Sequence, residues 1–586
     1  MSTGAPDPTP RVVQWNKDVA FGPDGPWHAV TVGVGTDAAG NPLSQVNLLP
    51  GAMGESIVFN TGYCSESGSS CPAQKAGFWD VKNSRTAIEN VRTNPATVWQ
   101  WGSSYAINQS GASLESVDQV SINTSQGLVA VNNTILASTS ADNVHSPDGS
   151  TWSQTIGSLS LGIHGGTLEF PNITGNTIPG YLASQNEILS NSVALHYGSA
   201  NLGIEGSLVY GGYDQSRVIG DVGVFQLSQP GDIPTPNLVD VQIGVESGDS
   251  PFANGTSKFI GLLEVNKSKP DGQPTVINAL LSYYFASNKT CDNIAKQLPV
   301  TFQPNLGLYT WNTGDPMFRS IVQSPSYLAF VFASGYPVSS GNLTIKVPFS
   351  LLNLTLEPPI VSAPLQYFPC QPFTASDGSG RNFLGRAFLQ AAFFAIDWNQ
   401  STYYMAQAPG PSPDAPNIQP LGPNSMTLQS NPASKFVDSW SKTWTPLKNQ
   451  QSASNTPQAQ PSDTSSDNGG GGSVLSKGAI AGISTGAAMG AIALAAAAWL
   501  LWRRRRKDRK TRAEQENDRR TLKPHGLNSL HEKEGGMPLP NEVIGDQRYV
   551  HEAPADTPRL EVEGDAPCVA DKDTFTLPAS MRQEMP

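Results

Sequence analysis

The sequence predicts an all-β extracellular region of two lobes, followed by a stalk, one transmembrane helix and a cytoplasmic tail. The chain contains 56 Gly and 47 Pro, while charged residues make up only 14% of it. This composition is typical of β-rich domains with many turns. Residues 478–502 carry no charge, which is the property expected of a membrane span.

Short apolar runs that alternate with polar residues fill the chain from Trp27 to about Met405, and turn residues separate them. This pattern predicts strands. The clearest runs are 28–36, 44–51, 55–59, 127–136, 206–213, 222–227, 326–333 and 342–356. Only 288–298 and 384–394 have a helical pattern. Because about 380 residues exceed one ordinary core, we expect two lobes, 27–229 and 230–405, after a flexible arm at 1–26.

The region after the lobes is predicted to lack a folded core. Residues 406–476 are rich in Pro, Ser, Gln, Asn and Asp, which predicts a disordered stalk. A helix over 477–502 would cross the ~30 Å hydrocarbon core, since each residue adds about 1.5 Å. The basic run 503–507 marks the cytoplasmic side, and the polar tail 503–586 is predicted to be disordered. We therefore expect a type I protein of the plasma membrane or another secretory-pathway membrane.

Glycosylation acceptors and cysteines are distributed in agreement with this topology. The Asn-X-Ser/Thr motifs all precede the span, at Asn108, Asn123, Asn132, Asn172, Asn254, Asn266, Asn288, Asn342, Asn353 and Asn399. Cys64, Cys71, Cys291 and Cys370 also precede it, and four oxidised cysteines can pair in three ways, whereas Cys568 is expected to stay reduced in the cytosol. Export needs a signal peptide, which the first residues do not resemble, so we expect it to be missing from this sequence or already removed.

Composition and motifs argue against several function classes. A formal net charge of −12 disfavours nucleic-acid binding, which requires a basic face. The seven histidines are scattered, without a metal-binding pattern, and no nucleotide-binding loop or serine-hydrolase elbow occurs. We therefore expect no metal, no cofactor and no nucleic-acid partner.

Several segments resemble the pepsin-like aspartic protease family (peptidase A1). FLGRAFLQAAFFAID at 383–397 resembles the conserved segment near the end of that family's second lobe, and GSLVYGGYDQSR at 206–217 resembles its strand between the lobes. VGVGT at 32–36 resembles an element of the first strand. With the predicted anchor and stalk, the chain is most similar to fungal membrane-anchored members. The resemblance covers roughly residues 27–405 and implies a bilobal acid protease fold.

The resemblance also implies specific roles for individual residues. Cys64 and Cys71 correspond to a short disulfide loop of the first lobe, and Cys291 and Cys370 to a disulfide of the second lobe. Tyr105 lies where the tyrosine of the substrate-covering flap would be, although the usual turn around it is absent, so a strand residue is the alternative.

The catalytic positions depart from the family pattern. The mechanism needs one aspartate per lobe, in Asp-Thr/Ser-Gly, so that two carboxylates share a proton and activate water. The family's distance between this aspartate and the first-lobe disulfide implies Pro50 or Gly51 for the first position. Its order of catalytic loop and helix implies Asn278 for the second. The triplets beginning at Asn60 and Asn312 are alternatives that we interpret as ordinary turns. None of these residues is a carboxylate, and an amide cannot act as a general base.

Three functions remain open from the sequence. The first is a pseudoenzyme with a monomeric ectodomain that binds an extended peptide, a protein or a cell-wall glycan between its lobes. The second is an active endopeptidase with carboxylates supplied from elsewhere, such as Asp80, Asp240 or Asp315. The third is a purely structural surface glycoprotein.

Overall fold

The protein consists mostly of β-strands, as the sequence predicts. The structure, a computed structural model, describes residues 7–64, 71–89, 96–97, 107–170, 172–265, 272–333, 341–374 and 380–448. Within these ranges no helix is long and apolar enough to cross a membrane. The predicted span at 477–502, the tail at 503–586 and most of the stalk lie outside the described residues.

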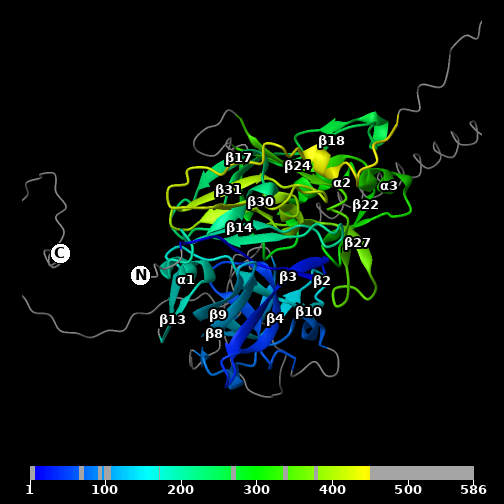
Figure 1. The fold of residues 1–586 in the computed structure, drawn as a ribbon. Helices are drawn as coiled ribbons and strands as arrows, with labels where there is room; N and C mark the ends of the chain where they lie inside the picture. The colour runs from blue at the N-terminus through cyan, green and yellow to red at the C-terminus, as the bar shows by residue number, and fades with distance from the viewer. Residues whose placement is uncertain are drawn as a thin grey trace, which may run out of the picture. The chain divides into compact units, whose positions relative to one another are not determined.

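We call residues 16–176 the first lobe; they form one large sheet, whose blue strands gather at one end of the folded body in Figure 1. Two long strands, β8 (Gln109–Thr124) and β9 (Gly127–His145), pair along most of their length. The strands of this sheet are β2 (Asn16–Phe21), β3 (Trp27–Thr36), β4 (Pro42–Ala52), β5 (Ser56–Phe59), β6 (Ile88–Glu89), β7 (Ala96–Thr97), β8 (Gln109–Thr124), β9 (Gly127–His145), β10 (Thr151–Ser153), β11 (Gly157–Ser160), β12 (Thr167–Phe170) and β13 (Ile173–Asn176).

We call residues 237–384 the second lobe; they contain an eight-stranded and a four-stranded sheet. The larger one is formed by β18 (Asn237–Val245), β19 (Lys258–Phe259), β20 (Gln273–Ile277), β21 (Tyr284–Ala286), β24 (Ser326–Phe332), β25 (Leu343–Pro348), β28 (Cys370–Pro372) and β29 (Asn382–Leu384). The smaller one is formed by β22 (Val300–Gln303), β23 (Leu308–Trp311), β26 (Leu354–Leu356) and β27 (Leu365–Phe368).

The same strand arrangement occurs at the centre of both lobes. In the first lobe the order is β4-β11-β5-β9, with parallel, antiparallel and parallel pairs in turn. In the second lobe the order β20-β29-β21-β28 repeats those directions. Each unit connects its first and third strands through a loop, and we call each loop, together with the strand ends beside it, the first loop (49–56) and the second loop (277–284). The two lobes therefore present equivalent loops, and these define where a shared site would lie.

A six-stranded sheet joins the lobes. Its strands run in the order β1 (Arg11–Val12), β15 (Ser207–Tyr210), β14 (Ser192–His196), β30 (Ala392–Asp397), β31 (Thr402–Gln407) and β17 (Ile219–Gln226). At its centre β14 and β30 are antiparallel, with Ala194 opposite Ala395. Both strands are buried along their whole length, so the junction contributes to the core rather than forming a hinge between separate bodies.

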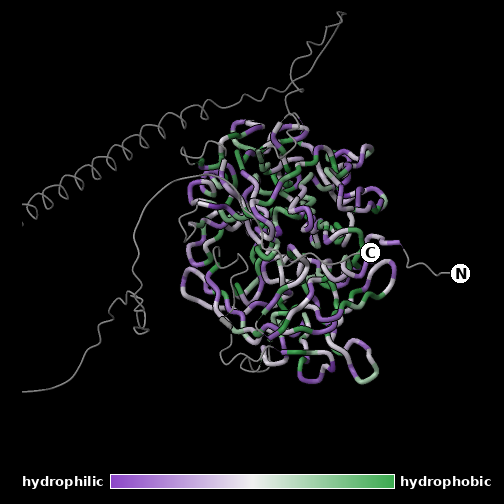
Figure 2. Tube along the Cα trace, turned by 90° about the vertical axis from the view of Figure 1, so that its left-hand side faces the viewer, coloured by the Kyte–Doolittle hydropathy of each residue, from purple (hydrophilic) through white to green (hydrophobic). Residues whose placement is uncertain are grey.

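The core is continuous through most of the folded body. Buried aromatic and branched side chains from both lobes and the joining sheet form one large cluster. In Figure 2 hydrophobic residues recur along the interior strands, while many peripheral loops are hydrophilic. The burial of so many apolar side chains stabilises the pairing of these strands, which contain few charged residues.

Both chain ends of the folded body are more ordered than expected. The prediction of a flexible arm at 1–26 is wrong for residues 7–26, since β1 pairs with β15 and β2 pairs with β3. The prediction of a disordered stalk is likewise wrong for residues 406–448. There β32 (Ile418–Pro420) pairs with β16 (Gly212–Asp214), and α5 (Phe436–Trp440) buries Trp440. A few aromatic and apolar residues are enough to order these two segments, because they pack against a core that other segments form.

The α-helices among the described residues are short. They are α1 (Ile178–Ser184), α2 (Asn288–Ala295), α3 (Pro316–Gln323), α4 (Arg386–Leu389) and α5. The helix predicted at 288–298 is confirmed as α2. The one predicted at 384–394 is confined to α4, because residues from Ala392 onward pair as β30 in the joining sheet.

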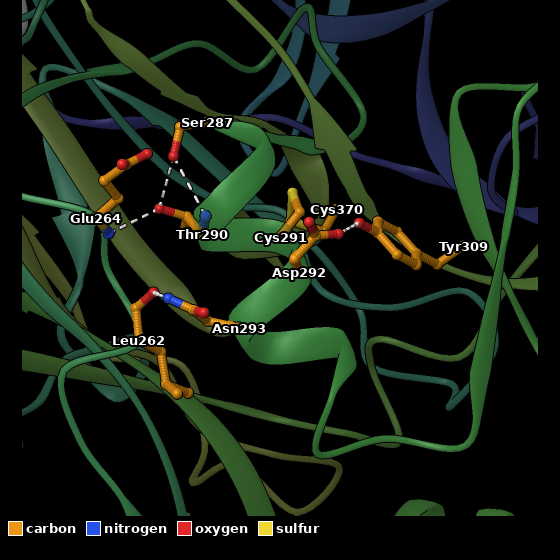
Figure 3. Close-up of a disulfide and its surroundings, with 9 residues drawn as sticks. All are labelled: Leu262, Glu264, Ser287, Thr290, Cys291, Asp292, Asn293, Tyr309 and Cys370. Carbon is orange, nitrogen blue, oxygen red and sulfur yellow. Dashed lines mark hydrogen bonds between the residues drawn. A yellow bond between two sulfur atoms is a disulfide. The ribbon is translucent and has the colours of Figure 1, made fainter. Parts of the chain in front are cut away.

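Two disulfides form, Cys64–Cys71 and Cys291–Cys370, and these are the pairs that the family resemblance implied. The second connects α2 to β28 (Figure 3). Hydrogen bonds fix α2 on both sides of this bridge: Thr290 Oγ1 accepts from the Glu264 backbone N–H at 2.8 Å, and Tyr309 donates to Asp292 Oδ1 at 2.7 Å. The helix is thus held to two neighbouring segments besides the disulfide.

Candidate functional site

The two equivalent loops meet face to face. A Cβ atom added to Gly51 would lie 2.7 Å from the Ala279 carbonyl carbon and 2.9 Å from the Leu280 nitrogen. Since such distances are shorter than any van der Waals contact, only glycine allows the loops to approach this closely. The positions that the sequence singled out, Gly51 and Asn278, thus lie at the contact between the lobes.

Asn278 has a structural role in the second loop. Its Oδ1 accepts from the Leu280 backbone N–H at 2.9 Å, and its own backbone N–H donates to the Leu384 carbonyl at 3.0 Å. The first bond is the local turn that Asn and Asp side chains form with a backbone two residues on. The side chain is only 4% exposed.

Arg386 stabilises the same loop through hydrogen bonds to its backbone. Its Nη1 donates to the carbonyl oxygens of Ala279 and Leu280, at 3.1 and 2.7 Å. Its guanidinium carbon also lies 5.0 Å from the centre of the Trp27 ring. Because this guanidinium is buried, its hydrogen bonds and a neighbouring carboxylate must compensate for the lost hydration.

That carboxylate belongs to Asp24, in the N-terminal segment. Asp24 Oδ2 lies 3.3 Å from Arg386 Nη2, and Ser282 donates to the same oxygen. Asp24 Oδ1 accepts from Trp27 Nε1 at 2.8 Å. Asp24 therefore connects the N-terminal segment with the second-lobe loop as one buried charged cluster.

Neutral hydroxyl groups hold the first loop instead. Ser158 Oγ donates to the Leu49 carbonyl at 2.8 Å and accepts from the Ala52 backbone N–H at 3.0 Å. Ser160 Oγ donates to the Gly54 carbonyl at 2.6 Å. Pro50 lies between these contacts, in β4 opposite Leu159 of β11. The first loop is thus fixed without any charged group among these contacts.

A cavity of about 450 Å³ lies beside the two loops. Its walls come from the first lobe, the second lobe and the N-terminal segment, for example at Ile57, Leu280 and Pro23. Tyr283 also borders it, and burial raises the pKa of this phenol, which therefore stays protonated as a donor. The volume is within the range of roughly 300–1,000 Å³ that small-molecule sites occupy.

Two buried carboxyl groups, Asp24 and Asp142, border this cavity. Asp142 accepts a hydrogen bond from Gln109 Nε2 at 3.1 Å. Burial raises the pKa of the Asp142 carboxyl from 3.8 to about 7, and the Gln109 bond opposes this only in part. Asp24 has a cationic partner in Arg386, whereas no ion pair is found for Asp142 among the described side chains. Asp24 is therefore paired with a cation, whereas burial favours the protonated, neutral form of Asp142.

The other candidates from the sequence lie away from the cavity walls. Asn60 and Asn312 form turns, in which they accept from Gly62 and from the Asp315 backbone N–H. Asp315 caps α3, Asp240 accepts from Gly261, and Asp80 accepts from the Asn83 side chain. Each of these contacts stabilises local structure. Tyr105 and Asn266 lie outside the described residues.

Most glycosylation motifs that the structure describes are accessible. The asparagines are exposed at Asn108, Asn123, Asn132, Asn172, Asn254, Asn288, Asn342 and Asn399, and partly buried at Asn353. Exposure is necessary for modification, so these positions are compatible with it. Among the described side chains, no cluster of His, Cys, Asp and Glu could hold a metal ion.

Sequence reasoning missed the residues that form the buried polar groups of the cavity. Asp24 lies in a segment that the sequence predicts to be flexible, and Arg386 lies within the segment 383–397 that resembles the protease family, where the resemblance implies no role for it. Asp142 follows a run of small polar residues within β9 and has no local signature. Asp24 and Arg386 are 362 positions apart, so no short-range pattern could have paired them.

Comparisons with known proteins leave the family open. The scan against family models found no match, and the search of curated proteins found none either. The chemistry of the site must therefore be judged from its own residues. Where the two loops meet, the residues are Gly51, Ala279 and Asn278, none of which has a carboxyl group. The adjoining cavity has both polar and apolar residues in its walls.

Proposed function

We propose that this chain is a membrane-anchored, glycosylated surface protein with a pepsin-like ectodomain that binds a ligand between its lobes without cleaving it. The family resemblance is supported by the repeated strand unit in the two lobes and by the joining sheet. The membrane anchor rests on the uncharged run at 478–502 and the basic residues that follow it.

One observation carries the proposal that catalysis is absent. Gly51 packs directly against the Ala279 backbone, at the place where a catalytic pair would face each other. No side chain at position 51 would fit there, and Asn278 provides an amide that is already engaged in its own turn. A shared-proton mechanism has no pair of carboxylates at this contact.

The second candidate, an active endopeptidase, is favoured by Asp24 and Asp142, which both border the cavity. We rank it lower for an electrostatic reason. Asp24 contacts Arg386, Ser282 and Trp27, while Asp142 contacts Gln109, so each carboxyl group has its own separate partners. Two catalytic carboxylates need instead to share one proton.

Cleavage of an unstructured protein by the purified ectodomain tests the absence of activity. The assay runs from pH 3 to 7, with and without a transition-state inhibitor of aspartic proteases, and with an active pepsin-like protease as positive control. We expect no inhibitor-sensitive cleavage. Cleavage that disappears in the Asp24→Asn or Asp142→Asn variant would establish the second candidate.

Binding is tested with a labelled unstructured polypeptide and fluorescence anisotropy. Leu306→Trp narrows the cavity, and Leu128→Trp, on an exposed strand position outside it, is the matched control. We expect Leu306→Trp to weaken binding at least tenfold and Leu128→Trp to leave it unchanged. Unchanged binding by Leu306→Trp would mean that polypeptide binds outside the cavity, and no binding by the unmodified ectodomain would favour a purely structural role.

A further inference from the structure

One wall of the cavity is formed by a single face of the first-lobe sheet. Gln109 of β8 lies opposite Val144 of β9, and Val144 lies opposite Trp152 of β10. Directly opposite residues of antiparallel strands point to the same side of a sheet, and so do residues two positions apart. Asp142 therefore lies on this face as well, and all four residues border the cavity. The face thus brings one carboxyl group into the cavity wall.

The carboxyl group of Asp142 is buried with little compensation. The residue is 5% exposed, and its Oδ1 accepts from Gln109 Nε2 at 3.1 Å. Among the described residues, neither an ion pair nor a hydrogen bond to Oδ2 is found for this carboxyl group. Burial consequently raises its pKa from 3.8 to about 7. A buried carboxyl group that borders a cavity in this way is suited to bind a ligand group of opposite charge.

The other charged or titratable groups around Asp142 do not balance its charge. Arg386 also borders the cavity, but its Nη2 lies 3.3 Å from Asp24 Oδ2, so these two groups balance each other. His145 is three positions further along β9, so its ring lies on the opposite side of the sheet, where it contacts hydroxyl groups of β8 and β10. The Tyr63 hydroxyl donates to the Asp142 backbone carbonyl at 3.0 Å, and burial raises the pKa of this phenol, which therefore stays neutral. A ligand must supply the missing positive charge.

The remaining walls suit the aliphatic part of a long side chain. Apolar residues from both lobes border the cavity, among them Ile57, Leu280 and Leu306. The half-buried ring of Trp152 lies on the same face as the carboxyl group, and an indole ring is the aromatic surface on which a guanidinium group stacks best. The cavity of about 450 Å³ has the size of small-molecule sites, so a single side chain can enter it.

We infer that the cavity binds an arginine side chain of the polypeptide ligand, with Asp142 as the residue that selects it. The guanidinium group pairs with the Asp142 carboxylate, and the aliphatic stem packs on the apolar walls. This inference rests on the proposed function, because it specifies which polypeptide the same cavity binds. Charge pairs that are removed from water at an interface couple strongly and set specificity. Since only the ionised carboxylate forms this pair, ligand binding releases the proton that Asp142 carries at lower pH.

A pair of labelled peptides tests the inference. One contains a single arginine among alanine, glycine and serine residues, and the other contains citrulline, which has nearly the same shape without the charge. Both are blocked at their termini and carry a label that does not titrate between pH 5 and pH 8. Fluorescence anisotropy measures their binding to the purified ectodomain at pH 8. We expect the arginine peptide to bind about tenfold more tightly, or better, because only its side chain pairs with the carboxylate.

Two variants assign the preference to one residue. Asp142→Asn removes the charge at nearly constant size, so the preference for arginine should fall to about twofold or less. Asp148→Asn is the matched control, since this aspartate is exposed in the turn between β9 and β10 and does not border the cavity, and it should keep the full preference. A cooperative unfolding transition verifies that each variant is folded.

The pH dependence of binding gives a second readout. Between pH 8 and pH 5 the unmodified ectodomain should lose affinity for the arginine peptide by about tenfold or more, because Asp142 takes up its proton. The arginine itself stays charged over this range. Neither the citrulline peptide nor the Asp142→Asn variant should show this loss.

Two results would overturn the inference: equal binding of the two peptides, or a preference for arginine that persists in Asp142→Asn. Either result leaves the proposed function standing, because the ectodomain still binds polypeptide. Conversely, inhibitor-sensitive cleavage would refute the proposed function even where arginine is preferred, and the absence of binding by both peptides would refute both hypotheses. The two hypotheses therefore fail on different measurements.

Discussion

The two central loops have equivalent places in the two lobes but are stabilised by different chemistry. The first-lobe loop is held by the hydroxyl groups of Ser158 and Ser160, which exchange hydrogen bonds with the backbone. The second-lobe loop is held by Arg386, whose charge is balanced by Asp24. Matching backbone paths thus do not require matching polar groups.

The difference has an energetic consequence. Neutral hydrogen bonds contribute modestly, about 0.5–1.5 kcal/mol each, and their loss costs the desolvation of one backbone group. A buried ion pair contributes little net stability, but removal of one partner leaves an uncompensated charge in the interior. The second loop is therefore expected to be far more sensitive to single substitutions than the first.

The largest expected effect is that of Arg386→Met. The substitution removes the partner of buried Asp24 and two hydrogen bonds to the loop, so we expect the free energy of unfolding to fall by about 3–5 kcal/mol. Chemical denaturation of the ectodomain measures it. Adding Asp24→Asn to this variant should recover part of the loss, because the unpaired charge is then absent. A loss below about 1 kcal/mol would contradict the assigned role of Arg386.

The second prediction compares the two carboxyl groups of the cavity through pH. The pKa of Asp142 is about 7 in the folded protein and 3.8 ordinarily, so the folded state binds the proton more tightly. Its contribution to stability is therefore most favourable below pH 4 and is lost as the pH rises toward 7. Asp142→Asn should remove this loss, and the variant should gain stability relative to the parent between pH 4 and pH 8. An identical pH dependence of unfolding in the two proteins would refute the shift.

The third prediction concerns the contact between the loops. Gly51→Ala places a methyl group 2.7 Å from the Ala279 backbone, so we expect a loss of about 1–3 kcal/mol from overpacking. Gly314→Ala is the matched control, since nothing lies within 4 Å of its added Cβ, and should change stability by about 0.5 kcal/mol or less. Thermal unfolding compares the two. Equal midpoints would mean that the loops can separate without cost.

The smallest effect is expected in the first loop. Ser158→Ala leaves the buried Ala52 backbone N–H without this acceptor, and we expect a loss of about 1–2 kcal/mol. Ser228→Ala, at an exposed position, is the control and should be close to neutral. Denaturation of both variants measures the difference. A loss from Ser158→Ala as large as that from Arg386→Met would erase the contrast between the loops.

The sequence by itself determined the strand-rich class, the position of most strands between residues 27 and 405, and the helix α2. These follow from local composition and alternation, which depend on neighbours within a few residues. The cysteine pairing also agreed with the family resemblance. The glycine at position 51 was identified from its spacing to Cys64, although its tight packing against Ala279 was not foreseen.

Only the tertiary structure decided what surrounds the cavity. Residues 7–26 and 406–448 are sparse in apolar groups, and they fold because they add to sheets and a core that distant segments have already formed. The pairing of Asp24 with Arg386 and the position of Asp142 at the cavity likewise depend on chain segments meeting in space. Local patterns carry no information on such long-range contacts, and these contacts set the electrostatics of the site.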